Sequence, residues 1–255
     1  MTGSGSQPSR ALEGRVILVT GAHGGLGAAA ARACARAGAT VVLLGRRIPR
    51  LNRIYDAIAA EGPEPHLYPM DLEGAAPDDH ATLASRISEG PGRLDGVLHC
   101  AADFHGLTPL LHTDPAALAR AIHVNLTARA WLSQACLPLL SAADDSALVF
   151  VVDDLARVGK AYWGGYGLAQ HGQHALVEML HAETARSPVR VSGLQPGPMR
   201  TGLRSRAYVE QEDTRAIDPA HAAEACVTLL SPSGAAHRGQ VWSPFATSTI
   251  GAHAS

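Results

Sequence analysis

The chain has 255 residues, of which 46% are hydrophobic and 17% are charged, and its formal net charge is -2. This composition excludes a disordered chain, a collagen-like repeat and a coiled coil, and the length fits one large domain over residues 1–255. The balanced charge provides no global field for nucleic acid or an anionic membrane. We therefore expect a globular protein that binds neither nucleic acid nor membrane.

Apolar, β-rich runs alternate with helical patterns along the whole chain. Continuous Val, Leu and Ile runs are typical of strands that are buried on both faces. The expected strands are residues 15–20, 40–44, 66–69, 96–100, 147–152, 189–194 and 240–242. The expected helices lie near residues 25–37, 49–60, 79–88, 114–140, 161–186 and 219–230.

This alternation predicts a parallel sheet with helices on both faces. Right-handed crossovers then give a single doubly wound, Rossmann-like α/β domain of about seven strands. Residues 197–216 form the one long irregular stretch, which we interpret as a lid over a substrate site. Residues 1–11 are mostly small and polar, which predicts a flexible tail rather than a signal peptide.

No apolar run approaches the roughly 20 residues of a membrane-spanning helix. The cysteines lie far apart and form no CxxC pair, so we interpret them as reduced core residues of a cytoplasmic protein. These cysteines are Cys34, Cys100, Cys136 and Cys226. No metal site is expected, because His171, His174 and His181 lack Cys or carboxylate partners at ligand spacing.

A glycine-rich run, TGAHGGLG at residues 20–27, follows the first expected strand and opens an alanine-rich helix. Glycines let the backbone turn tightly and approach a pyrophosphate, and the helix N-terminus offers free N–H groups at the positive end of its dipole. This position predicts a dinucleotide-binding loop, although a plain structural turn would use glycine too. The expected contacts are Gly21, His23, Gly24, Gly25, Leu26 and Gly27.

The end of the second expected strand indicates which dinucleotide binds. An acidic residue there would accept hydrogen bonds from the adenosine ribose of NAD, whereas this chain has Arg46 and Arg47. Two arginines suit the additional 2′-phosphate of NADP(H), so NADP(H) is expected in preference to NAD(H). The alternative is a pair of solvated arginines that open a helix. After the third strand, Asp71 and Leu72 are placed either to contact the adenine or to cap a turn.

In these motifs and several later residues, the chain resembles the short-chain dehydrogenase/reductase family. The resemblance covers roughly residues 12–245, and the runs LLGR, LDGVLH, WGGY and PGPMRT are most similar to the bacterial YciK-type branch. The matching positions are Gly21, Gly25 and Gly27 of the TGxxxGxG loop, Asp71, Asn125, Tyr166, and Pro196, Gly197 and Thr201 of the PGxxxT segment. The resemblance implies a Rossmann-like oxidoreductase that uses a nicotinamide cofactor.

The resemblance also implies four catalytic residues, of which this chain keeps two. Family members combine Asn, Ser, Tyr and Lys. Tyr is the general acid/base, Lys holds the nicotinamide ribose and lowers the pKa of the Tyr, and Ser binds the substrate oxygen. Asn125 and Tyr166 are present, but the Lys position holds Gln170 and the Ser position holds Asp153. The turn after the fourth strand reads CAA instead of NAG, with Ala101 as the expected cofactor contact.

These replacements weaken the expected acid/base chemistry. A Lys ammonium about 6 Å from a phenol favours the phenolate by roughly 2–3 kcal/mol at an effective dielectric of about 20. Gln170 removes this contribution, although its amide can still bind a ribose hydroxyl. An ionised Asp153 adds a like charge and donates no hydrogen bond to a carbonyl. We therefore expect cofactor binding to survive better than catalysis.

Other groups could take over the lost roles. Asp153 could itself be the general acid if a dry pocket kept it protonated. Lys160 could swing inward from the preceding loop, or it is a solvated loop residue. His174 shares a helical face with Tyr166 and could carry protons, or it packs in a helix interface.

Two kinds of partner follow from the remaining residues. In the family, the helices that correspond to those of Asn125 and Tyr166 pair across a dimer interface, which implies a homodimer or homotetramer. The candidate contacts, which could equally be core residues, are Trp131, Leu132, Leu137 and Leu176. The expected lid carries Arg200, Arg204, Arg206 and Arg215. These arginines either recognise an anionic substrate or partner, or are solvated residues of a surface loop.

Two classes of function stay open. The first is an NADP(H)-dependent oxidoreductase that acts on an unidentified small-molecule carbonyl or alcohol. The second is a catalytically inactive NADP(H)-binding protein with a regulatory or assembly role. The family resemblance favours the first, and the paired loss of Ser and Lys favours the second. The sequence has neither a GxSxG elbow nor a GxxxxGK[ST] loop, which argues against Ser-hydrolase and NTPase chemistry.

Overall fold

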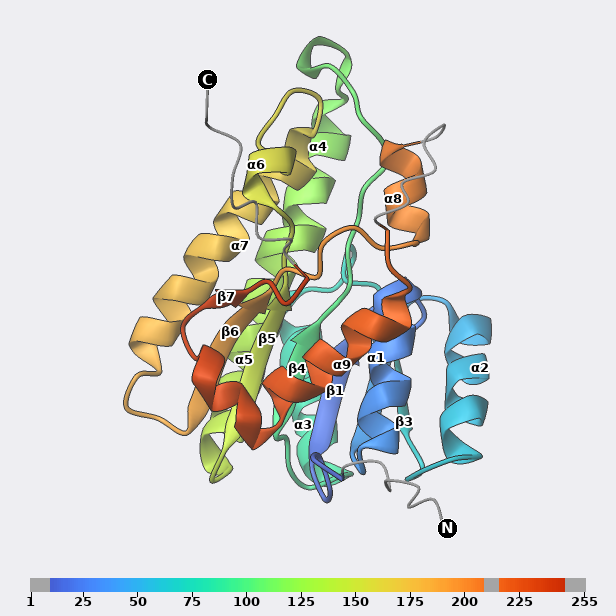
Figure 1. The fold of residues 1–255 in the computed structure, drawn as a ribbon, viewed down its shortest axis with the longest axis vertical. Coiled ribbons are helices and arrows are strands. Elements are labelled where there is room, and N and C mark those ends of the chain that lie inside the picture. The colour runs from blue at the N-terminus through green and yellow to red at the C-terminus, as the bar shows by residue number, and fades with distance from the viewer. Residues whose placement is uncertain (1–9, 209–215, 246–255) are drawn as a thin grey trace, which may run out of the picture.

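A parallel sheet of seven strands forms the centre of the molecule (Figure 1). The computed structural model describes residues 10–208 and 216–245. Within these residues the strand order is β3-β2-β1-β4-β5-β6-β7, and each neighbouring pair is parallel. The predicted doubly wound α/β fold is confirmed. The strands are β1 Val16–Thr20, β2 Thr40–Gly45, β3 His66–Pro69, β4 Gly96–His99, β5 Ser146–Val151, β6 Val189–Leu194 and β7 Val241–Trp242.

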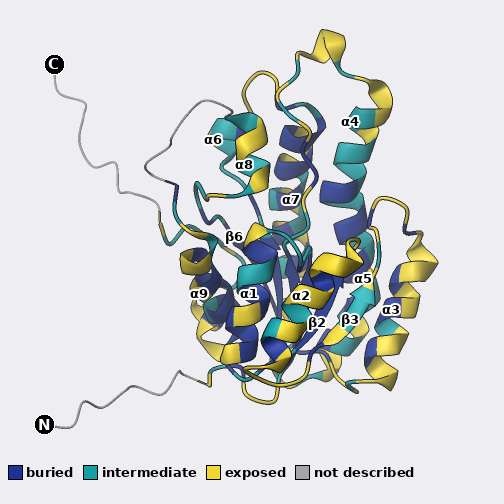
Figure 2. Cartoon of the chain, turned by 90° about the vertical axis from the view of Figure 1, so that its right-hand side faces the viewer, coloured by how far each residue is buried: buried dark blue, intermediate teal, exposed yellow. Residues whose placement is uncertain are grey.

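Helices cover both faces of this sheet (Figure 1). One hydrophobic core lies between the sheet and helices α1, α2 and α9, and a second lies between the sheet and α3, α5 and α7. Helices α2 and α3 show buried inner sides and exposed outer sides (Figure 2). The helices within the described residues are α1 Gly25–Arg36, α2 Ile48–Ala59, α3 Pro77–Glu89, α4 Pro115–Ile122, α5 Ala128–Ala142, α6 Leu155–Val158, α7 Gly164–Glu183, α8 Gly202–Ala207 and α9 Pro219–Leu230.

The apolar runs of the sequence become strands that serve both cores. Successive side chains of a strand point to opposite faces, so Ile17 and Val19 pack into the first core while Leu18 packs into the second. Burying one such side chain contributes roughly 1.5–3 kcal/mol. Runs without polar alternation are therefore stable only in a sheet covered on both faces, as the sequence predicted.

Three predictions about the elements need correction. The helix expected over 114–140 is divided into α4 and α5 by a π-helical turn, His123–Thr127. The stretch expected to be irregular over 197–216 contains α8, and Met199 pairs with Ile217 in an isolated parallel bridge. Residues 1–9 of the predicted tail lie outside the described residues, but Ala11 packs against the first core. The predicted tail of residues 1–11 therefore includes at least one residue, Ala11, that belongs to the packed domain.

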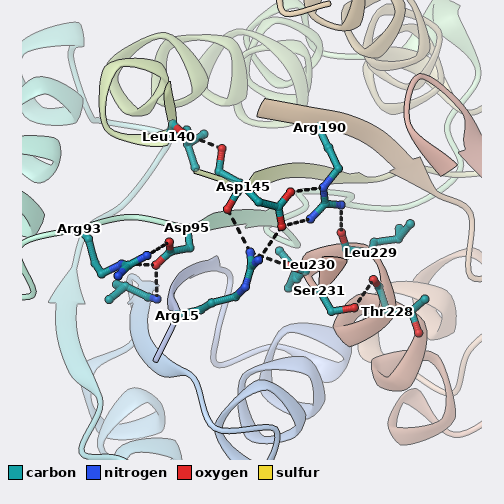
Figure 3. A network of polar contacts seen from close by, with 12 residues as sticks. Arg15, Arg93, Asp95, Leu140, Asp145, Arg190, Thr228, Leu229, Leu230 and Ser231 are labelled. Atoms are coloured by element: carbon teal, nitrogen blue, oxygen red, sulfur yellow. Dashed lines mark hydrogen bonds and ion pairs between the residues drawn. The ribbon is translucent and has the colours of Figure 1, made fainter. Parts of the chain in front are cut away.

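At the amino ends of the strands, buried and half-buried charges connect elements that lie far apart in the chain (Figure 3). Asp145 forms ion pairs with Arg15 at 2.5 Å and with Arg190 at 2.7 Å. Asp95 accepts the Val16 N–H at 2.8 Å. Burial opposes ionisation of Asp145, but hydrogen bonds from Arg190 and Arg15 outweigh it and lower the pKa of this carboxyl. This network holds the end of the sheet opposite the crevice described next.

The chain order creates a crevice at the carboxyl ends of the strands. After β1 the chain builds outward to β2 and β3, and it then returns to place β4 on the other side of β1. Loops that leave β1 and β4 therefore diverge, which opens the site where doubly wound folds bind ligands.

Cys34, Cys136 and Cys226 are buried and free, and Cys100 is half-buried and free. Among the described residues, no helix is long and apolar enough to cross a membrane.

Candidate active site

A cavity of about 540 Å³ occupies the crevice, and loops from the carboxyl ends of β1 to β6 contribute to it. This volume lies within the range usual for small-molecule and cofactor sites. All but one of the residues predicted for the site line this cavity. They are Gly21, His23, Gly24, Gly25, Leu26, Gly27, Arg46, Arg47, Asp71, Leu72, Ala101, Asp153, Tyr166, Gln170, Pro196, Gly197 and Thr201. The exception is Asn125.

The glycine loop is built so that only glycine fits at its close contacts. Gly21 has a φ of +64°, and a Cβ there would lie 2.7 Å from the Cα of Ala101. A Cβ on Gly27 would lie 2.2 Å from the carbonyl oxygen of Gly21. No side chain caps the N-terminus of α1 at Gly24, and the first turn has no acidic residue. The free N–H groups and positive dipole end therefore face the cavity, where an anion would be stabilised.

Cationic side chains gather beyond β2. Arg46, Arg47 and Arg50 line the cavity beside His23. Arg46 also reaches across to the loop after β3, where it forms ion pairs with Asp71 at 3.4 Å and with Glu73 at 3.6 Å. Burial lowers the pKa of His23, and the neighbouring arginines lower it further. The sequence identified Arg46 and Arg47, but not Arg50, which joins them only because α2 turns it toward the same corner.

Asn125 fastens the loop after β4 without lining the cavity. Its side chain is fully buried in the π-helical turn. The Nδ2 group donates to the Asp103 carbonyl at 2.7 Å and to the Ala121 carbonyl at 2.7 Å, and Oδ1 accepts the Asp103 N–H at 3.0 Å. The side chain thus joins the loop after β4 to the last turn of α4, and π turns of this kind are frequent at functional sites. Asn125 therefore has a positioning role in this geometry.

Tyr166 and Asp153 meet across the cavity floor. The Tyr166 hydroxyl donates to Asp153 Oδ2 at 3.2 Å, and Arg157 forms an ion pair with Asp153 Oδ1. This ion pair fits a carboxylate better than the protonated acid considered from the sequence. Tyr166 is 5% exposed. Burial and the charge of Asp153 raise the pKa of Tyr166 well above its ordinary value, whereas Arg129 and Arg157 oppose that increase.

Gln170 lies one helical turn after Tyr166, and its side-chain carbonyl accepts the Asp153 N–H at 2.9 Å. Its amide oxygen therefore supports the main chain that carries Asp153. His174, one turn further, contacts the Asp153 carbonyl with Nε2 at 3.3 Å. Lys160 is exposed and does not line the cavity, which fits the solvated loop residue rather than an inward-swinging cation.

The most important residue missed by the sequence reasoning is Arg129. It is 1% exposed, it lines the cavity, and it comes from α5. One signal was available: Arg129 is the sole charged residue of the segment 128–142, which is otherwise apolar or small and polar. The side chain of a single charged residue in such a segment either lies in the core or points to solvent. The sequence alone did not decide which of the two holds for Arg129.

The lid arginines are divided between the cavity and the surface. Arg204 and Arg206 line the cavity, and Arg204 lies 4.7 Å from the ring centre of Tyr208. Arg200 instead donates to the Ala216 carbonyl at 2.7 Å and pairs with Asp218 at 3.8 Å. Arg215 lies outside the described residues. Over residues 10–208 and 216–245, no cluster of His, Cys, Asp or Glu is arranged to hold a metal.

Comparisons with known proteins agree with this architecture. The family model described as short chain dehydrogenase matches residues 15–212. The chain is 36% identical over 210 residues to the uncharacterized oxidoreductase YciK of Escherichia coli K12. The aligned region covers 82% of this chain and 83% of YciK.

Two solved structures extend the comparison. A short chain dehydrogenase of Escherichia coli CFT073 complexed with NADPH is 33% identical, with a TM-score of 0.87 over 92% of this chain and 99% of that one. A short chain dehydrogenase of Shigella flexneri 2a complexed with NADP is 32% identical, with a TM-score of 0.88 over 93% of this chain and 99% of that one. With the sheet order and the glycine loop in place, the match over residues 15–212 shows that the chain belongs to the short chain dehydrogenase family of oxidoreductases.

Proposed function

We propose that this protein is an NADP(H)-dependent oxidoreductase that interconverts a carbonyl and an alcohol. One observation carries the proposal: Tyr166 presents a hydroxyl to the same cavity that the glycine loop and the arginines line. A phenol beside a bound nicotinamide is suited to exchange a proton with a substrate oxygen. The NADP and NADPH complexes of two similar structures support this choice of cofactor.

The residues of the cavity fit NADP(H) in shape and charge. The absence of a Cβ at Gly27 lets the start of α1 pack directly on Gly21, and a glycine loop folded this tightly lets its backbone approach a pyrophosphate. The uncapped N-terminus of α1 would hold that pyrophosphate. Arg46 and Arg47 would bind the 2′-phosphate, because guanidinium groups match phosphate oxygens in geometry and charge.

The remaining predicted contacts would hold the rest of the cofactor. Asp71 and Leu72 lie beside the expected adenine position, and Ala101 lies on the turn after β4. Pro196, Gly197 and Thr201 line the side that faces α8, and a Cβ on Gly25 would lie 2.8 Å from Thr201 Cγ2. This close packing of the glycine loop against Thr201 would place the nicotinamide half of the cofactor near Tyr166.

The protein residues divide the chemistry in the following way. Bound NADPH would supply a hydride to the carbonyl carbon. Tyr166 would give its hydroxyl proton to the carbonyl oxygen and take it back in the reverse direction. Asp153 would accept a hydrogen bond from Tyr166 or from an alcohol, and Gln170 would hold the main chain of Asp153 in place. Asn125 would fix the loop that forms the opposite wall.

A second function is a non-catalytic NADP(H)-binding protein. The observation that favours it is the state of Tyr166, whose hydroxyl is bound by Asp153 while its pKa is raised by burial and by that carboxylate. A phenol of this kind gives up its proton reluctantly. In this reading the cavity binds the cofactor and the protein acts through a partner.

We also propose a second copy of the chain as an assembly partner. Leu168 is 61% exposed and Met179 is 58% exposed. They lie eleven residues apart on α7, which places them on one helical face. Leu132, a candidate contact from the sequence, is fully buried in the monomer core, whereas Trp131, Leu137 and Leu176 are half-buried. Sedimentation of the wild type and of a Leu168→Lys/Met179→Lys variant tests this proposal, and an unchanged mass contradicts it.

The first experiment is a binding titration of NADPH and of NADH, followed by nicotinamide fluorescence. We expect NADPH to bind more tightly than NADH, which would support the cofactor site. Failure of both to bind up to millimolar concentration would contradict both proposed functions.

A panel of aldehydes and ketones then separates the two functions. Turnover of NADPH that depends on Tyr166 supports the oxidoreductase, with Tyr166→Phe as the matched control for contaminating reductases. Tight NADPH binding without Tyr166-dependent turnover on any member of the panel supports the non-catalytic protein instead.

A further inference from the structure

Arg129 is a buried cation at the junction of three elements of the site. Its guanidinium donates to the Val151 carbonyl at 3.0 Å, to the Ala101 carbonyl and to Gln173 Oε1. These acceptors lie at the end of β5, just after β4 and on α7. The side chain therefore reaches from α5 to the cavity that Tyr166 also lines.

No anion compensates this charge. Among the described residues, Arg129 takes part in none of the ion pairs, and its Nε has no hydrogen-bond partner. Burial lowers the pKa of Arg129 to about 10. Burying an unpaired charge costs several kcal/mol, so a fold retains one at a site where something else benefits.

Among the described residues, Arg129 is the buried cavity arginine that joins no ion pair. Asp153 at the end of β5 and Arg157 on α6 form an ion pair, so their charges largely cancel at the hydroxyl. The cavity also holds Asp103 and Cys100 after β4, and Arg204, Arg206 and Tyr208 at α8. At its far side, around the glycine loop and the ends of β2 and β3, lie His23, Arg46, Arg47, Arg50 and Asp71. Arg206 donates to the Phe104 carbonyl at 2.7 Å, and Arg204 lies over Tyr208. The buried cation that opposes the high pKa of Tyr166 most strongly is Arg129.

We propose that Arg129 is a positioning residue for proton transfer, holding a positive charge against Tyr166, and that Gln173 aims its guanidinium. The inference rests on the proposed oxidoreductase function. In the reduction, the carbonyl carbon gains a hydride from NADPH, which becomes NADP⁺. The Tyr166 O–H bond breaks as the proton passes to the substrate oxygen, so an alcohol and a phenolate form. The charge of Arg129 stabilises that phenolate, and Gln170 contributes no charge to it.

The test measures the phenol of residue 166 directly, without requiring turnover. Tyr166 is replaced by 3-nitrotyrosine through amber suppression, because this phenol titrates near neutral pH and its ionisation is visible by absorbance. Titrations are compared in the otherwise wild-type protein, Arg129→Met, Arg129→Lys and Arg129→Met/Gln170→Lys. Arg190→Met is the matched control, because Arg190 is also a buried arginine but lies at the opposite end of the sheet.

We expect Arg129→Met to move the titration upward by about one to two pH units, as loss of a nearby charge predicts. Arg129→Lys keeps most of the charge and should move it by less. Adding Gln170→Lys to Arg129→Met should reverse at least half of this upward shift, since the new lysine supplies a cation in place of Arg129. An unchanged titration in Arg129→Met, or an equal shift in Arg190→Met, overturns the proposal.

Kinetics on a substrate from the carbonyl panel provide the second measurement. In the alcohol-oxidising direction, Arg129→Met should move the rise of kcat/KM to higher pH while NADP⁺ affinity changes less than threefold. If no substrate turns over, the proposed function fails on its own. The titration of residue 166 still decides whether Arg129 acts on the phenol.

Discussion

The hydroxyl of Tyr166 donates to Asp153 Oδ2 at 3.2 Å, while Arg157 forms an ion pair with the other oxygen of the same carboxylate. A phenol in this contact keeps its proton, because its ionisation would place two anions side by side. The proposed proton donor is therefore held by the group that makes it a weak acid.

Replacing Asp153 by Ser should increase carbonyl reduction. The substitution removes the anion beside Tyr166 and supplies a hydroxyl that can donate to a carbonyl oxygen. We expect about a tenfold rise in kcat/KM, the equivalent of one unit in the pKa of Tyr166. Asp154→Ser is the matched control, because serine can still cap α6 and an equal charge is removed.

The double variant Asp153→Ser/Gln170→Lys restores both residues that the family pattern implies. It should reduce generic carbonyls faster than the wild type. Because Arg129 already supplies a cation, the added lysine should contribute less than Asp153→Ser does. No gain over the panel in either variant would mean that these two positions do not limit turnover.

Tyr166→Phe should abolish the native activity while it leaves the cofactor site intact. Loss of a general acid/base costs roughly 10²–10⁴-fold in rate. NADPH affinity should change by less than threefold, since the glycine loop and the arginines are untouched. Turnover at the wild-type rate in this variant would remove Tyr166 from the mechanism.

Arg46→Ala/Arg47→Ala should weaken NADPH binding and leave NADH binding unchanged. Charge-assisted hydrogen bonds to a phosphate are worth about 1.5–3 kcal/mol, which corresponds to roughly 10–100-fold in Kd. Nicotinamide fluorescence measures both affinities. Arg36→Ala, at the far end of α1, is the control. An equal loss for both cofactors would show that the arginines support the fold rather than the 2′-phosphate.

The Asp145 network predicts an acid-sensitive contribution to stability. The pKa of Asp145 is lower in the folded state than in the unfolded state, where it is about 4. The network therefore stabilises the fold above about pH 4, and this stabilisation is lost as the pH falls through the folded value. Urea unfolding of Asp145→Asn should show a loss of about 1–3 kcal/mol at pH 7.

The pH dependence distinguishes this cause from a general packing defect. The difference in unfolding free energy between the wild type and Asp145→Asn should shrink below pH 4. A difference that stays constant from pH 7 to pH 3 would contradict the assignment to the carboxylate charge. Asp144→Asn is the control, because Asp144 is next in the chain and takes no part in the ion pairs of Arg15, Arg93 and Arg190.

The sequence by itself determined the class of fold and the cofactor loop. Unbroken apolar runs require burial on both faces, and glycines between a strand and a helix have few local solutions. Local chemistry also identified Arg46 and Arg47, and the family resemblance identified Tyr166. All three line the crevice.

Only the tertiary structure decided how the charges of the site are paired. Gln170 turns its carbonyl to the Asp153 N–H, Arg157 pairs with Asp153, and Arg129 reaches three acceptors on different elements. The π turn around Asn125 was equally hidden, because its side chain is bonded to the loop after β4, which lies 22 residues earlier in the chain. Most of these contacts join residues far apart in the chain, and two of the three acceptors of Arg129 are main-chain carbonyls. Main-chain acceptors carry no residue-specific signature, so the sequence pattern could not place the buried cation.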